Sequence, residues 1–110
     1  MKVLKRTKNA TRSDQTKTTL VQLEYLDSQA DSVCVSGTFN NWHPSATPMT
    51  ASVHGHWKKD LELPPGTYEY ALVVDGHRWV PDPRCQEKVE NSFGGLNSVL
   101  KVPPRGNGTN

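Results

Sequence analysis

Strict alternation of apolar and polar side chains is the feature that most constrains the fold of this 110-residue chain. In TTLVQLEYL (residues 18–26), apolar side chains occupy alternate positions, with the polar Gln22 and Glu24 between them. Successive side chains of a β-strand point to opposite faces, so this period of two predicts a strand with one buried face. The same period recurs in residues 31–37, 56–64 and 67–74, and no stretch predicts a long helix.

Turn-forming residues separate these stretches. The polar segment DSQAD (residues 27–31) suits a hairpin turn, Pro64-Pro65-Gly66 ends a strand, and Asp75-Gly76 turns the chain again. A last strand is expected at about residues 96–102, after an irregular stretch from His77 to Gly95. Short strands with a turn about every ten residues are typical of an antiparallel β-sandwich. The alternate positions expected in its core are Val21, Leu23, Val33, Val35, Leu61, Leu63, Tyr68, Tyr70, Leu72 and Val74.

The length of the chain fits one domain, which we expect at residues 18–102. Residues 1–17 and 103–110 contain almost no core-forming side chains and are expected to be flexible tails. The first tail holds six Lys or Arg residues against the single acid Asp14, a composition that could also contact nucleic acid. Because the remaining chain is close to neutral, we expect a solvated tail and no nucleic-acid partner.

The lengths of the apolar segments and the number of cysteines indicate the expected localisation and redox state. No apolar segment is long enough for a signal peptide or a membrane span, so we expect a cytoplasmic protein without a membrane partner. Cys34 and Cys85 do not form a disulfide framework and are expected to be reduced and unpaired.

The three tryptophans occur in different contexts. Trp57 shares the parity of the core positions around it and is expected in the core. Trp42 lies among Asn and Pro residues in SGTFNNWHPSATPM (residues 36–49), and Trp79 lies in GHRWVPDP (residues 76–83), each outside a periodic strand. Two such residues on loops that follow core strands suggest a paired aromatic platform. The alternative is structural, because a loop tryptophan can also plug the end of a sandwich.

An aromatic platform suits carbohydrate. A flat indole can cover the C–H face of a pyranose ring, and a covered patch of ~50 Å² contributes on the order of 1 kcal/mol. The amide of Asn97, in GGLNS at the start of the last strand, offers both a donor and an acceptor to vicinal hydroxyls. On the residues alone, carbohydrate binding ranks narrowly ahead of a protein-interaction surface.

Catalytic and metal sites are less well supported. His54 and His56 are two residues apart, but a metal site needs further ligands, and an exposed hairpin loop with no metal is expected. Glycoside hydrolysis requires two carboxyl groups held across a cleft, for which a sandwich this small has little room. The chain is therefore predicted to be a non-enzyme without a cofactor. The carboxylates weighed as catalytic candidates are Asp75, Asp82, Glu87 and Glu90.

Four motifs together resemble carbohydrate-binding module family 48. These are VSGTFNNW, LELPPGTYEYALVVDGHRW, PDP and NSVLKV, in this order, and the resemblance covers about residues 18–102. The family includes the glycogen-binding domain of the AMP-activated protein kinase β subunit and the N-terminal modules of glycogen branching and debranching enzymes. The resemblance implies an immunoglobulin-like sandwich and non-catalytic binding of α-1,4-glucans such as glycogen, starch and maltooligosaccharides.

The resemblance also implies which residues bind sugar. Trp42 and Trp79 match the two tryptophans that stack on the glucan in the family. Phe93 stands where the family has a leucine at the tip of the last loop, and Asn97 matches an asparagine that bonds sugar hydroxyls. Phe39, close to Trp42, is expected to anchor its loop inward.

Two positions depart from the family pattern. Its sugar-contacting lysine is Ala71 here, and a threonine of the last loop aligns with Gly95. Arg78, Lys58 or His77 are the alternatives for a substitute donor. These departures favour a second interpretation, in which the domain is a scaffold that holds a glycogen-metabolising enzyme or a kinase and binds sugar weakly or not at all.

Overall fold

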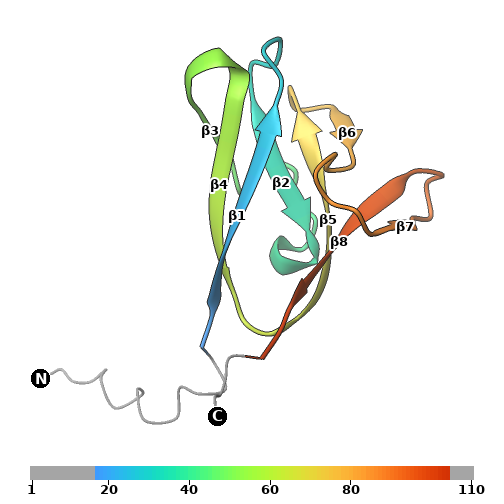
Figure 1. Ribbon diagram of the computed structural model, residues 1–110. Helices are drawn as coiled ribbons and strands as arrows, with labels where there is room; N and C mark the ends of the chain where they lie inside the picture. The colour runs from blue at the N-terminus through green and yellow to red at the C-terminus, as the bar shows by residue number, and fades with distance from the viewer. Residues whose placement is uncertain (1–16, 105–110) are drawn as a thin grey trace, which may run out of the picture.

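Two antiparallel sheets make up the computed structural model, which describes residues 17–104. In the first sheet the strand order is β1-β4-β3, and in the second it is β2-β5-β8-β7, with β6 also paired to β5 (Figure 1). The predicted all-β, immunoglobulin-like antiparallel sandwich is confirmed. The elements are β1 (Thr19–Leu26), β2 (Val33–Gly37), the 3₁₀ helix η2 (Thr38–Asn40), β3 (Thr50–Ala51), the 3₁₀ helix η3 (Val53–Gly55), β4 (His56–Leu63), β5 (Gly66–Val74), β6 (Arg78–Val80), β7 (Lys88–Glu90) and β8 (Leu96–Val102).

The predicted hairpin turn at residues 27–31 is wrong. β1 pairs with β4 and β2 pairs with β5, so this segment carries the chain from one sheet to the other. The segment forms an arch instead, and Asp75 caps its end: the carboxylate accepts hydrogen bonds from the backbone N–H groups of Asp31 (2.7 Å) and Ser32 (3.1 Å). Turn chemistry of this kind suits a hairpin and an arch equally, and only strand pairing distinguishes them.

The stretch from His77 to Gly95 is also less irregular than expected. It contains β6 and β7, each only three residues long, which is too short to show a period in the sequence. Trp79 therefore lies on a strand and not on a loop. The predicted last strand coincides with β8, at residues 96–102.

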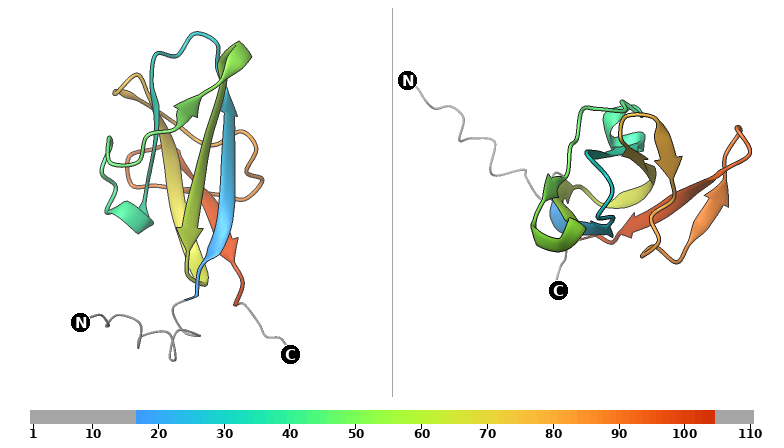
Figure 2. Two further views of the ribbon diagram at one scale, coloured as in Figure 1. Left: turned by 90° about the vertical axis from the view of Figure 1, so that its left-hand side faces the viewer. Right: turned by 90° about the horizontal axis from the view of Figure 1, so that it is seen from above.

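The core lies between the two sheets, which the two views of Figure 2 show as separate layers. All ten positions predicted to be apolar core residues are buried in this cluster or packed against it. Trp57 is 8% exposed, and its indole Nε1 donates a hydrogen bond to the backbone oxygen of Asp27 at 3.1 Å, so its core assignment is confirmed.

The outer face of the second sheet is partly buried as well. Ala71 and Val73 alternate with the core residues of β5, yet they are 4% and 1% exposed. Val73 is the register partner of Trp79 on β6, so the two side chains share that outer face. This face, on the opposite side of the sheet from the core, is where the candidate site lies.

Several other expectations concern the rest of the chain. The predicted tails lie outside the described residues except for residues 17, 103 and 104. Cys34 and Cys85 are free thiols in the structure. Within residues 17–104, no helix has the length and apolar character needed to cross a membrane.

Candidate functional site

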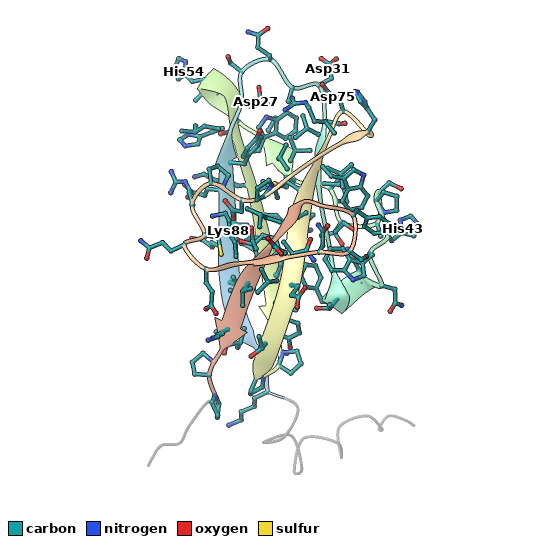
Figure 3. All side chains as sticks on the ribbon, turned by 90° about the vertical axis from the view of Figure 1, so that its right-hand side faces the viewer. Asp27, Asp31, His43, His54, Asp75 and Lys88 are labelled. Carbon is teal, nitrogen blue, oxygen red and sulfur yellow. The ribbon has the colours of Figure 1, made fainter. Side chains whose placement is uncertain are left out.

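An open groove with a volume of about 950 Å³ lies over the outer face of the second sheet. All four residues proposed to bind sugar line it: Trp42, Trp79, Phe93 and Asn97. Figure 3 looks onto the side of the molecule that carries β6 and β7. The remaining lining residues are Thr38, Glu69, Ala71, Pro81, Glu90, Asn91, Ser92, Gly95 and Leu96.

Trp42 reaches the groove from a tight turn after η2. The side chain of Asn40 holds this turn, since its Oδ1 accepts from the N–H of Gly37 and its Nδ2 donates to the backbone oxygen of Val35, each at 3.0 Å. The N–H of Trp42 then donates to the backbone oxygen of Gly37 at 2.8 Å. Asn41 and Trp42 both have positive φ, 57° and 59°, which is uncommon for a residue as bulky as tryptophan. Such strain persists only where the surroundings impose it, and it is concentrated at functional sites.

Phe39 anchors the same turn to the core, as expected. It packs against the core, with its ring 6.1 Å from that of Tyr68 at an interplanar angle of 64°. Gly37 allows the close approach of this turn to β5, because a Cβ at that position would lie 2.5 Å from the backbone oxygen of Glu69. The backbone leading to Trp42 is thus packed directly onto the strand that forms the groove floor.

Trp79 enters the groove from β6 and is 48% exposed. Its neighbours on the strand point the other way: Val80 packs against the core, and Arg78 Nη2 lies 3.5 Å from Asp27 Oδ2. The pairing of β6 with β5 therefore determines which face the indole occupies. About half of the residue is covered by the protein, and the rest is exposed to solvent.

A chain of side-chain amides holds the opposite wall. Asn97 is 8% exposed; its Nδ2 donates to Glu69 Oε1 and its Oδ1 accepts from Asn91 Nδ2, each at 3.1 Å. Asn91 Oδ1 in turn accepts from the N–H groups of Phe93 (2.9 Å) and Gly95 (3.0 Å). The amide of Asn97 thus makes two hydrogen bonds inside the protein, which leave one N–H and one lone pair of the amide unused by them.

This network places Phe93 at the tip of the β7–β8 hairpin, where its side chain is 93% exposed.

Sequence reasoning missed Glu69 and Asn91, both of which line the groove. Glu69 and Ala71 are two residues apart on β5, so their side chains lie on the same outward face. Because the family's sugar-contacting lysine aligns with Ala71, Glu69 could have been recognised as a neighbour of the site. Asn91 precedes a Gly-Gly turn, a place where an asparagine side chain commonly caps backbone N–H groups.

None of the alternatives for the missing lysine lines the groove. Arg78 faces Asp27, and the Nδ1 of His77 is 2.8 Å from the backbone oxygen of Asp75. Lys58 lies on β4, in the other sheet. Ala71 forms part of the groove floor, and no substitute cation stands in its place among the lining residues of the described chain.

The four carboxylates weighed as catalytic candidates are dispersed, and only Glu90 lines the groove. The two backbone N–H groups on Asp75 lower the pKa of its carboxyl group. Asp82 is buried and accepts from the hydroxyl of Tyr70 at 2.6 Å, while Glu87 lies 3.3 Å from Lys101. Burial and the Asp82 hydrogen bond raise the pKa of Tyr70 far above its usual value.

Among residues 17–104, no three His, Cys, Asp or Glu side chains gather closely enough to hold a metal ion.

Comparison with known proteins gives a consistent result. Residues 12–107 match the family described as the glycogen recognition site of AMP-activated protein kinase. The 5'-AMP-activated protein kinase subunit beta-1 of Sus scrofa is 39% identical over 70 residues, which cover 64% of this chain and 53% of that protein. The beta-1 subunit of Bos taurus is 40% identical and the beta-2 subunit of Homo sapiens 37%, each over 64% of this chain and 24% of the relative. The chain thus spans between a quarter and about half of the length of these relatives.

Proposed function

The chain belongs to the family of glycogen recognition domains of AMP-activated protein kinase, and on this premise we propose that it binds α-1,4-linked glucans through the groove on its second sheet. The ligands are glycogen, starch and the maltooligosaccharides derived from them. Trp42 and Trp79 stack on sugar rings, and Phe93 extends the apolar surface at the hairpin tip.

The observation that carries this proposal is the convergence of aromatic side chains from three separate segments on one groove. Trp42 follows η2, Trp79 is on β6 and Phe93 is in the β7–β8 hairpin. Trp79 and Phe93 are exposed and Trp42 is half-buried, and large apolar side chains that stay partly exposed together are typical of a binding surface. A groove of about 950 Å³ is also in the size range of known ligand sites.

Polar groups at the rim supply the hydrogen bonds of the complex. Asn97 is among the polar residues that line the groove, together with Thr38 and Ser92. Because no lysine or arginine among residues 17–104 lines the groove in place of the family's sugar-contacting lysine, stacking provides most of the affinity.

We also propose that the chain is a binding module and not an enzyme. Glu69 is hydrogen-bonded to Asn97, and three of the four carboxylates weighed as catalytic lie away from the groove. A glycosidase pair needs two carboxyl groups on opposite sides of the scissile bond, with one of them able to donate a proton.

The relatives suggest the wider setting. They are named as subunits of a protein kinase, so we propose that the protein carrying this chain brings a kinase, or a glycogen-metabolising enzyme, to glucan. Its two free thiols suit a reducing compartment such as the cytoplasm. The second candidate is a scaffold domain that holds such a partner without binding sugar, and it is favoured by Ala71 at the lysine position.

Co-sedimentation separates the two candidates. The wild-type chain is expected to pellet with insoluble starch and to stay in solution with cellulose, whose β-linkage presents the rings differently. The double variant Trp42→Ala/Trp79→Ala is expected to lose starch binding. Leu20→Ala, which removes an exposed apolar side chain from the first sheet, is the matched control and is expected to bind like wild type. Wild-type protein that does not pellet with starch would support the scaffold function.

A further inference from the structure

The charge of the groove points to a selectivity that stacking does not explain. Within residues 17–104, the residues that line it include the acidic Glu69 and Glu90 and no Lys, Arg or His. We propose that the groove selects neutral glucans and rejects glucans that carry phosphate esters. This inference rests on the proposed function and adds the chemical class of ligand that the site accepts.

Among the described residues, the cations of the second sheet do not line the groove and have other partners. Lys88, on β7, donates to the backbone oxygen of Cys85. In Figure 3 it is separated from His43, the neighbour of Trp42, by β5 and β8. Three other cations face carboxylates outside the groove: Arg78 faces Asp27, Arg84 faces Glu24 and Lys101 faces Glu87.

Glu69 places its charge in the floor of the groove. It lies on β5 next to Ala71 in the outward-facing series, and Asn97 Nδ2 holds its carboxylate at 3.1 Å. Glu90 ends β7 at the base of the hairpin that carries Phe93. Both glutamates line the same groove as Trp42 and Trp79, so a glucan in this groove is expected to lie near them. Neutral hydroxyls can donate hydrogen bonds to carboxylate oxygens, whereas the phosphate dianion has only acceptors to offer.

The size of the effect follows from Coulomb's law. A phosphate ester carries a charge of about −1.5 to −2 at neutral pH. For an assumed separation of ~8 Å from each of two carboxylates, it is expected to weaken binding about tenfold at ~0.01 M salt, about threefold at ~0.15 M, and hardly at all at ~1 M. Binding of the neutral glucan is expected to change little over the same range, because it involves no ion pair.

The experiment measures the affinity of the full chain for maltoheptaose and for maltoheptaose phosphorylated at one 6-hydroxyl, at ~0.01 M and ~1 M salt. The ratio of the two affinities is the readout. Glu69→Gln/Glu90→Gln is expected to bring the low-salt ratio close to one, since glutamine keeps the size and the acceptor for Asn97 while removing the charge. Glu62→Gln, on the outer face of the first sheet, is the matched control and is expected to keep the wild-type ratio.

Equal or tighter binding of the phosphorylated ligand at low salt would overturn the inference and leave the proposed function standing. Discrimination that persists at high salt or in the double variant would also overturn it, because the cause would then be steric. Wild-type protein that binds neither ligand would overturn the proposed function, and this inference with it.

Discussion

Replacing Trp79 by alanine separates a ligand platform from a structural plug. Trp79 is 48% exposed and sits on a three-residue strand at the margin of the second sheet. If it stacks on sugar, its loss weakens binding while the domain still folds. If it only plugs the sandwich, its loss affects stability alone.

The exposed part of the ring determines the expected loss of affinity. A tryptophan side chain presents up to roughly 250 Å² of surface, so about 120 Å² of Trp79 is open. A pyranose ring on one face of the indole covers about half of that, and ~60 Å² of apolar burial is worth ~1.5 kcal/mol. We therefore expect Trp79→Ala to raise the Kd for maltoheptaose about tenfold.

The covered part of the ring determines the expected loss of stability. It packs over Val73, and removing it is expected to cost about 2 kcal/mol, which a domain with 5–15 kcal/mol of stability tolerates. Trp57→Ala is the contrasting variant, because Trp57 is buried and bonded to Asp27. It is expected to cost about 3–5 kcal/mol of unfolding free energy.

Calorimetric titration with maltoheptaose, run beside thermal melts of each variant, tests both expectations. Unchanged affinity in a folded Trp79→Ala protein would refute the platform. A Trp57→Ala protein that melts like wild type, beside a Trp79→Ala protein that does not fold, would reverse the division between core and site.

Three further predictions follow from the hydrogen-bond networks. Asn91→Ala, which frees the Phe93 hairpin, is expected to weaken maltoheptaose binding about threefold to tenfold with little change in melting temperature, and an unchanged Kd would contradict this. The raised pKa of Tyr70 keeps its phenol neutral in the folded state, so stability is full below the unfolded pKa of about 10 and falls as the pH rises above it. Urea midpoints between about pH 8 and 11 are expected to fall less steeply for Tyr70→Phe than for wild type, and parallel curves would refute the assignment. The lowered pKa of Asp75 contributes stability above its usual value of 3.8 that is lost as the pH falls through the lowered pKa. Asp75→Asn is expected to show a smaller loss of stability on acidification, and an acid transition identical to that of wild type would contradict it.

Much of the sandwich could be predicted from the sequence because burial on one face leaves a period of two. The core positions of β1, β2, β4 and β5 follow from parity alone. Pairing did not follow, because alternation shows that a strand has a buried face but not which strand lies beside it. The arch at residues 27–31 was predicted as a hairpin for this reason, and the three-residue β6 and β7 were too short to show a pattern.

The sequence indicated the aromatic residues of the candidate site and one amide, Asn97, but not the side chains that hold this amide in place. Trp42 and Trp79 were recognisable because bulky rings stood where no core pattern continued. Glu69 and Asn91 were not recognisable, because each matters through a hydrogen bond with Asn97. Glu69 is 28 residues from Asn97 in the sequence, and Asn91 is 6 residues from it. The strain at Trp42, with its positive φ, is likewise a property of the folded turn.

The indole N–H signals of the three tryptophans in a proton–nitrogen NMR spectrum test the central claim most directly. Trp42 and Trp79 line the groove, whereas Trp57 is buried with its Nε1 bonded to Asp27. As maltoheptaose is added, the account predicts that the signals of Trp42 and Trp79 shift to saturation with one Kd while that of Trp57 stays in place. Three unmoved signals, or a shift confined to Trp57, would contradict glucan binding in this groove.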